Sequence, residues 1–327
     1  MPSLITHDIF AKEVYNKLPS HIKDTFKQEK QIYQTFAQSH DYLFYYKSLN
    51  IRLTKKVNRL GKIGHRRNTQ DYIINIIKLI QEYHLQLYQP DIAYLYGTIT
   101  HYILDSTCHP FIFYKTGVYD SRKKIKSQKK YKGLHALMER SLDAYYYKKY
   151  YKKEYKLCNV SKEIIKNPKL SIDLITLINM AYKKTYNEDN VGIYYYKGIK
   201  NAKRIYSLFI NDKHKIKYKI YSFIDKITKN KLGYINAFST STPIIEDYLN
   251  INHKEWNHPC IKEEIHNESF EDLYNIALEK CLIIFEAIYQ VLYENKNINT
   301  LKKVIPNVSY STNLDLTKNK PMKYFEF

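Results

Sequence analysis

Apolar residues recur every three or four positions along most of this 327-residue chain. The clearest case is residues 68–87, where isoleucine, leucine and tyrosine side chains line one face of an amphipathic helix. Thr6 is a suitable cap for a first helix that ends at Pro19, and Ser269 with Asp272 resembles a capping box. The pattern predicts an all-α protein built as a single-domain helical bundle. Further helices are expected over residues 21–38, 170–186, 193–210, 215–229 and 269–294.

Stretches without a helical period separate these segments. Residues 39–46 are interpreted as a loop with aromatic anchors, residues 47–66 as basic and irregular, and residues 231–266 as another loop. Residues 296–327 are polar, and we expect them to form a loosely attached tail on a domain that spans residues 1–295. Eight glycines and nine prolines are too few for the tight turns of an all-β sandwich. The chain also lacks a glycine-rich phosphate loop, which disfavours the common nucleotide-binding folds.

One predicted helix carries a row of residues that suits a metal ion. The helix begins at Pro90, and His101, Asp105 and His109 follow one another at spacings of four, so they share one face. Imidazole and carboxylate groups are the ligands that zinc takes in proteins. Because Pro110 disfavours helix at the preceding residue, His109 is expected at the helix end. The alternative is an ordinary polar stripe whose hydrogen bonds are already satisfied.

His135 and Glu139 repeat the pattern on a separate predicted helix, again four residues apart. Two facing helices of this kind would close a metal site in the core of a bundle. The second pair therefore favours metal binding over the ordinary polar stripe.

The formal net charge of +21 favours anionic partners such as lipid surfaces, nucleic acid or phosphorylated substrates. The joint abundance of Lys, Ile, Asn and Tyr would also follow from an AT-rich genome, which weakens that inference. The strongest candidate for binding an anionic membrane surface is the run of residues 122–132, which contains no acidic residue. A solvated loop is an equally good interpretation of this run. Its seven cationic residues are Arg122, Lys123, Lys124, Lys126, Lys129, Lys130 and Lys132.

The first residues, Met1-Pro-Ser-Leu-Ile-Thr-His-Asp, lack the basic start and apolar run of a signal peptide. The most apolar later segment, residues 281–293, is too short to span a bilayer. We therefore expect a cytoplasmic protein that can associate peripherally with a membrane. Its four cysteines are interpreted as reduced thiols, and no feature indicates an obligate protein partner.

Taken together, these residues resemble the zinc-dependent phospholipase C family, in particular its intracellular bacterial branch. The resemblance covers about residues 1 to 145 and consists of short motifs in a fixed order. The motifs are Thr6-His7, Asp41 before an aromatic run, an isolated His65, His101-Tyr-x-x-Asp105, His109 beside Pro110, and His135-x-x-x-Glu139 followed by Asp143.

The resemblance implies an α-helical protein whose two or three zinc ions hydrolyse a phosphodiester bond, in a phospholipid or another phosphodiester. It implies that Asp41 corresponds to the family's proposed general base. It also implies three ligand sets: His65, His101, Asp105 and Asp41 for one zinc, His109, His135 and Glu139 for the second, and His7 with a bridging Asp105 for the third.

The N-terminal residue completes the third site in the family, and here that residue would be Pro2 after removal of Met1. The spacing from Asp105 to His109 is shorter than in the secreted family members, and Pro110 follows the histidine where theirs precedes it. The expected number of ions is therefore two or three.

Other functions and other roles stay open on the sequence. A related group of zinc nucleases shares the helical trinuclear design, and a non-catalytic metal-binding helical protein is the alternative outside the enzymes. Taken singly, Asp41 suits a loop cap, His7 a helix-end histidine and His65 an exposed basic loop. His40 is expected at the surface or, as the alternative, beside a ligand that it orients. Cys108 is interpreted as a buried, inert thiol.

Overall fold

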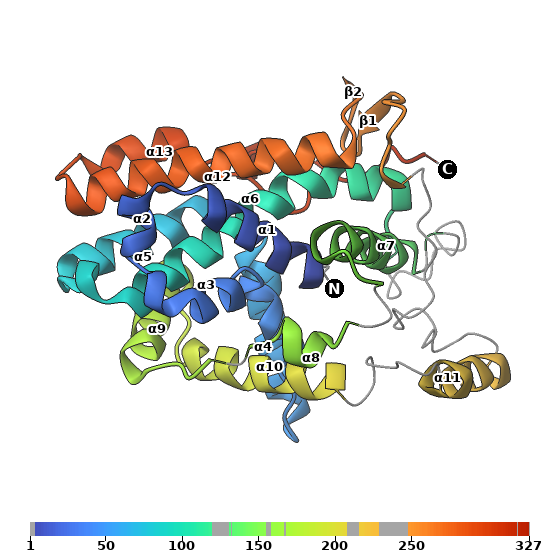
Figure 1. Cartoon of the computed structure of the whole chain (residues 1–327), viewed down its shortest axis with the longest axis horizontal. Coiled ribbons are helices and arrows are strands. Elements are labelled where there is room, and N and C mark those ends of the chain that lie inside the picture. The colour runs from blue at the N-terminus through green and yellow to red at the C-terminus, as the bar shows by residue number, and fades with distance from the viewer. Residues whose placement is uncertain are drawn as a thin grey trace.

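The computed structural model describes residues 4–119, 131, 133–154, 158–166, 168–207, 216–228, 248–318 and 320–326. Nearly all of the regular secondary structure in these residues is helical, so the predicted all-α class is confirmed (Figure 1). The helices of the first half are α1 (Leu4–Lys17), α2 (Ser20–Asp24), α3 (Lys30–Phe36), α4 (Ile51–Gly64), α5 (Thr69–Glu82), α6 (Gln89–Thr116) and α7 (Leu134–Tyr151). Those of the second half are α8 (Val160–Glu163), α9 (Ile172–Tyr186), α10 (Val191–Ile205), α11 (Ile216–Ile227), α12 (Phe270–Tyr293) and α13 (Leu301–Val304).

Two parts of the sequence interpretation lie outside the described residues. One is Pro2, the expected N-terminal ligand, and the other is the set of seven cationic residues between Arg122 and Lys132. No helix in the described ranges is both long enough and apolar enough to cross a membrane.

α6 is the central helix of the fold. It packs against α1, α3, α5, α7 and α12, and Figure 1 shows α12 running alongside it. Tyr94, Leu95 and Tyr96 are completely buried, and successive residues of a helix point about 100° apart around its axis. A helix that is apolar on nearly every side belongs in the interior of a protein. Polar residues on α6 are therefore held inside the molecule.

The predicted end of this helix at His109 is wrong, because α6 continues through Pro110 to Thr116. An interior proline removes one backbone donor and costs about 3 kcal/mol. Burial of Phe111 and Ile112 in the next turn offsets that cost. The helix ends instead at Gly117, whose φ of 62° suits a glycine. His109 consequently keeps a helical direction and stays on the face of Asp105.

α1 is joined to α7 through a buried aspartate. The backbone N–H and the hydroxyl of Thr6 donate to Asp143 Oδ1 at 2.7 and 2.9 Å. Because α1 begins at Leu4, Thr6 lies inside the helix, and the prediction that Thr6 caps this helix is wrong. The two hydrogen bonds fix the first turn of α1, with His7, against the helix that carries Glu139.

The expectation that residues 47–66 are irregular is also wrong, since most of them form α4. The Asn50 side chain accepts from Leu53 N–H and caps the helix. Val57, Leu60 and Gly64 supply a narrow buried stripe between the basic positions. Gly64 allows close approach, because a Cβ at this position would lie 2.7 Å from the His40 ring. Residues 39–46, predicted as a loop, form a 3-10 helix over Ser39–Tyr45.

The second half departs from the sequence interpretation at two places. Within the loop predicted for residues 231–266, β1 (Trp256–His258) and β2 (Ile261–His266) form an antiparallel hairpin. The segment after residue 295 packs closely against the bundle, since Leu301, Ile305 and Tyr310 are buried. These apolar residues have no regular period, so the sequence pattern did not reveal them. The capping box at Ser269 is confirmed at the start of α12.

Candidate metal centre

Four predicted ligands converge from three elements of the fold, and we name them the central ligand group: Asp41, His65, His101 and Asp105. Helical spacing places His101 and Asp105 on the same side of α6. His65 follows the last residue of α4, and Asp41 lies in the 3-10 helix over Ser39–Tyr45. All four are buried except His65, which is 12% exposed.

The spacing of their ligand atoms fits one zinc ion. At zinc–ligand distances of about 2.0 to 2.2 Å, neighbouring ligand atoms in a tetrahedron lie about 3.4 Å apart. His65 Nε2 lies 3.2 Å from Asp41 Oδ1 and 3.4 Å from His101 Nε2. Asp105 Oδ2 lies 3.6 Å from His101 Nε2 and 3.9 Å from His65 Nε2. Asp41 Oδ2 lies 3.7 Å from His101 Nε2, so each oxygen of this carboxylate lies near one of the two histidines.

A second set, named here the outer ligand group, consists of His109, His135 and Glu139. Glu139 Oε1 lies 3.0 Å from His135 Nε2 and 3.6 Å from His109 Nε2. His135 and Glu139 share one face of the first two turns of α7, as their spacing predicted. Three protein ligands leave room for a water or a substrate oxygen in the fourth position of a zinc site.

His7 lies between the two groups and contacts Asp105. Its Nε2 atom is 3.1 Å from Asp105 Oδ1, whereas the other oxygen of that carboxylate faces the central group. A cavity of 20 Å³ adjoins these atoms and is lined by His7, Asp105, His109 and Glu139 among others. A space of this size holds about one small occupant. The carboxylate of Asp105 is thus placed to bridge two neighbouring metal positions, one at the central ligand group and one at His7.

Hydrogen bonds to the backbone orient two of the histidines. His65 Nδ1 lies 2.7 Å from the carbonyl oxygen of Gly61, and His109 Nδ1 lies 3.0 Å from that of Tyr310. A carbonyl accepts only from a protonated nitrogen, so Nε2 of a neutral ring is left with its lone pair toward the other ligands. Both rings are therefore held in the tautomer that a metal requires.

Tyr310 is a participant that the sequence did not reveal. Its backbone N–H donates to the His65 carbonyl at 3.1 Å, while its own carbonyl accepts from His109. Its ring packs 4.7 Å from the His65 ring and 5.5 Å from the His101 ring, centroid to centroid. One residue of the C-terminal segment therefore fixes a ligand of each group.

The carboxylates in the site carry charges that the histidines offset. Burial raises the pKa of Asp105, but the imidazoles of His109 and His101 lower it more, so the net pKa is well below the ordinary value. Burial lowers the pKa of His109, but the carboxylates beside it raise the net value to about 9. Burial raises the pKa of Asp41, which makes this carboxylate a better proton acceptor.

Several ligand atoms have no hydrogen-bond partner among the described residues. They are the carboxylate oxygens Asp41 Oδ2, Asp105 Oδ2 and Glu139 Oε2. A buried carboxylate oxygen without a partner is costly, and a bound cation removes that cost. The residues present therefore fit metal ions in the type of their donor atoms, in the spacing of these atoms and in having carboxylate oxygens without a hydrogen-bond partner.

Two further residues near the ligand groups, His40 and Cys108, are both buried. His40 is completely buried, with Nδ1 at 2.8 and 2.7 Å from the hydroxyls of Tyr182 and Tyr195, so the expectation of a surface histidine is wrong. It supports the backbone next to Gly64 and His65. Cys108 is buried as expected, and burial raises the pKa of its thiol, so it stays protonated and inert. All four cysteines are free.

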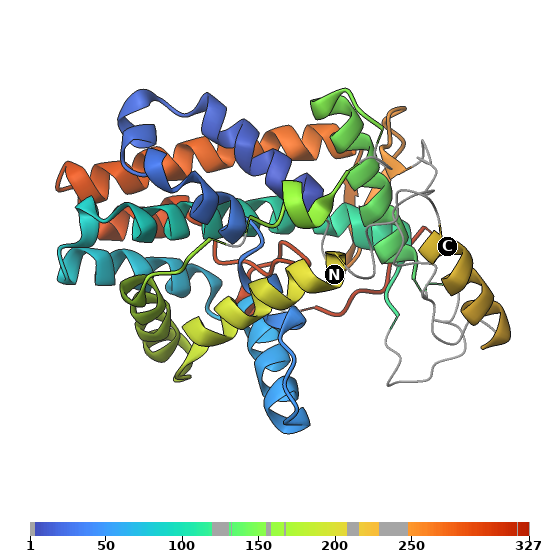
Figure 2. The same ribbon diagram turned by 60° about the horizontal axis from the view of Figure 1, so that its bottom comes forward.

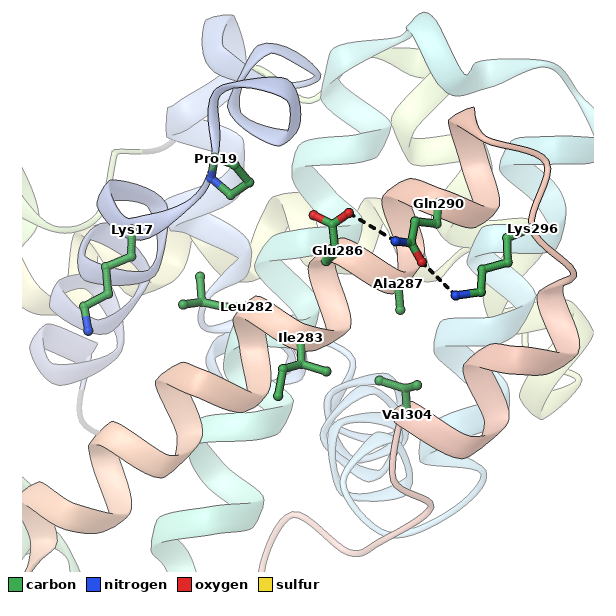
Figure 3. A pocket seen from close by; sticks show the side chains of 9 residues that line it. All are labelled: Lys17, Pro19, Leu282, Ile283, Glu286, Ala287, Gln290, Lys296 and Val304. Atoms are coloured by element: carbon green, nitrogen blue, oxygen red, sulfur yellow. Dashed lines mark hydrogen bonds between the residues drawn. The ribbon is translucent and has the colours of Figure 1, made fainter.

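A larger groove of 540 Å³ lies elsewhere on the molecule, along α12 (Figure 3). Leu282, Ile283 and Ala287 form its apolar floor, and Gln290 accepts from Lys296 at 2.8 Å at one end. None of the predicted ligands lines this groove. The volume of a pocket thus does not mark the chemical site here, whereas the convergence of ligand atoms does.

Comparison with known proteins agrees with a metal centre at the two ligand groups. The model of the zinc-dependent phospholipase C family matches residues 6–190, more than half of the chain, and this range contains the eight residues predicted to bind metal through their side chains. Neither curated proteins nor solved structures gave a match. The match over residues 6–190, together with two convergent ligand groups inside it, places the chain in the zinc-dependent phospholipase C family.

Proposed function

We propose that this protein is a phosphodiesterase that binds two or three zinc ions and cleaves glycerophospholipids on the diacylglycerol side of the phosphate. The observation that carries the proposal is the pair of ligand groups bridged near Asp105, in a chain of the zinc-dependent phospholipase C family. The central group would hold one ion and the outer group a second. His7 and Asp105 would contribute to a third.

When bound, zinc ions supply positive charge that stabilises a phosphoryl transition state, and they acidify water. The residues of the chain provide the remaining functions. Asp41 presents one oxygen toward His65, while its other oxygen has no hydrogen-bond partner among the described residues. That second oxygen can orient the attacking water and take up its proton.

The exposed edges of the site indicate where a substrate would approach. His135 is 26% exposed and His109 is 12% exposed, whereas His101 is completely buried. The aromatic run after Asp41 does not offer a surface for lipid contact, because four of its five residues, Tyr42, Leu43, Tyr45 and Tyr46, are buried in the core. Support for a lipid substrate therefore comes from the family and not from this run.

Product analysis tests the proposal. The zinc-loaded protein is incubated with mixed phospholipid vesicles and, in parallel, with single-stranded DNA and RNA. We expect diacylglycerol and a phosphorylated head group from the vesicles and no nucleotides from either nucleic acid. Protein treated with a chelator and then returned to zinc controls for metal dependence. Nucleotide release without diacylglycerol would assign the chain to the nuclease alternative, and inactivity on all three with zinc bound would reject a phospholipase.

A further inference from the structure

α4 and the residues next to it form a strongly cationic ridge. Residues 42–70 contain eight lysines and arginines and no acidic residue. Lys56 and Arg59 pair with Glu188 at 2.8 and 3.4 Å. The other six have no ionic partner among the described residues: Lys47, Arg52, Lys55, Lys62, Arg66 and Arg67. Because their charges are not neutralised by the protein, they are available to an anionic partner.

Two aliphatic residues lie bare at one end of this ridge. Leu49 is fully exposed, at 104% of its reference area, and Ile51 is 69% exposed. Figure 2 shows α4 projecting from the body of the molecule. A projecting element that exposes aliphatic side chains among cations has the composition of a segment that enters the headgroup region of a bilayer.

The cations follow the whole length of α4 and are not gathered at its tip. Arg52, Lys55, Arg59 and Lys62 recur at spacings of three or four, so they share one side of the helix. Beyond the helix, Arg66 and Arg67 help to line a recess of 240 Å³ with Arg59 and Lys62. This arrangement suits a helix that lies along an anionic surface.

The far end of the ridge adjoins the metal centre, since His65 directly follows α4. We propose that α4 is a membrane-docking element, with Leu49 and Ile51 entering an anionic phospholipid bilayer and the cationic side of the helix lying on its headgroups. The proposal goes beyond the catalytic function, because binding to lipid does not require turnover. Nucleic acid is a weaker candidate, because aliphatic side chains supply neither stacking nor base readout.

Co-sedimentation of the full zinc-loaded chain with vesicles tests this assignment. One vesicle type contains phosphatidylglycerol and phosphatidylcholine, and the other contains phosphatidylcholine alone. We expect binding to the first, weak binding to the second, and loss of binding as salt is raised. Diacylglycerol release is followed in the same samples, so that absence of turnover and absence of binding are distinguished.

Two double variants address the two parts of the ridge. Arg52→Gln/Lys55→Gln should weaken binding about 25-fold, because each charge near an anionic surface contributes about fivefold. Leu49→Ser/Ile51→Ser should weaken it by about tenfold or more through lost apolar insertion. All four positions are exposed and outside the ligand groups, so the thermal midpoint and the hydrolysis of a soluble phosphodiester should not change.

Matched controls lie elsewhere on the surface. Leu87→Ser removes an equally bare leucine, 90% exposed, from a segment without lysine or arginine nearby in sequence. Lys302→Gln/Lys303→Gln removes two exposed lysines that have no ion pair among the described residues. Both controls should bind vesicles like the wild type. Full binding by both ridge variants would overturn the proposal. Binding of single-stranded DNA is measured for the same variants. If Leu49→Ser/Ile51→Ser binds vesicles normally while Arg52→Gln/Lys55→Gln no longer binds the DNA, the proposal is also overturned.

Discussion

α6 carries two buried aspartates at different points along its length, and they differ in their surroundings. Asp91, in the first turn, is completely buried, and neither carboxylate oxygen has a hydrogen-bond partner in the described part of the chain. Asp105, in the middle of the helix, is 4% exposed and lies among His7, His65, His101 and His109. The same residue type on the same helix therefore occupies two opposite electrostatic environments.

The difference shows what a metal centre adds to burial. Burial raises the pKa of Asp91 to about 7, and the nearby Asp173 carboxylate acts in the same direction. At Asp105 the imidazoles overcome burial and lower the pKa well below its ordinary value. A buried carboxylate alone becomes neutral, whereas a carboxylate among convergent imidazoles stays charged. Only the second arrangement is suited to hold a cation.

The largest effect is expected from Asp105→Ala, because this carboxylate faces the central ligand group and His7. Zinc content should fall to about one ion per chain, held by the outer ligand group, and the free energy of unfolding should fall by about 3 to 5 kcal/mol. Elemental analysis of the purified protein and chemical unfolding measure the two quantities.

Glu139→Ala is the matched comparison, since Glu139 belongs to the outer ligand group alone. This variant should lose one ion and keep the ion of the central group. Equal zinc loss in both variants would mean that Asp105 serves the central group alone and does not hold a further ion with His7.

Tyr310→Ala should have the next largest effect, because the ring packs against His65 and His101 and the backbone holds His65 and His109. Removing a fully buried aromatic ring costs about 3 kcal/mol or more. Zinc affinity should fall at both ligand groups. Tyr310→Phe keeps the ring and serves as the control. Wild-type zinc affinity in the alanine variant would show that the ring of Tyr310 does not position the ligands.

A smaller effect, confined to turnover, is expected from Asp41→Asn. The amide keeps the shape of the carboxylate and removes its negative charge, so turnover should fall at least about 100-fold while most of the zinc is retained. Phosphodiester hydrolysis and zinc content are measured on the same preparation. Full activity would remove Asp41 from the mechanism, and loss of most of the zinc would identify it chiefly as a ligand.

Local patterns in the sequence were sufficient for the parts of the site that lie on one helix. The spacing of His101 and Asp105, and that of His135 and Glu139, led directly to faces that the structure brings together. Helical geometry fixes such pairs without knowledge of the rest of the fold. The all-α class followed from the same periodicity.

Contacts between distant segments could not be obtained in this way. Tyr310 acts through its backbone on His65 and His109, and a backbone contact leaves no mark on residue type. α4 was missed because its buried stripe depends on Gly61 and Gly64, which a search for bulky apolar residues passes over. The continuation of α6 beyond Pro110 depends on tertiary burial that outweighs a local preference.

The final prediction concerns Asp91, the isolated member of the pair on α6. Its pKa is about 7 in the folded protein and about 3.9 in an unfolded chain, so the folded state holds the extra proton between these values. Stability from this group is therefore complete below about pH 4 and is lost as the pH rises toward 7. In Asp91→Asn the loss does not occur, because the amide carries no charge to desolvate. The advantage of the variant in unfolding free energy should grow by about 1 to 2 kcal/mol between pH 5 and pH 8, after structural relaxation has reduced the full linkage value. Urea unfolding of both proteins at the two pH values measures this change, and the wild type corrects for every other titrating group. An advantage that stays constant with pH would show that Asp91 is charged in the folded protein, as Asp105 is.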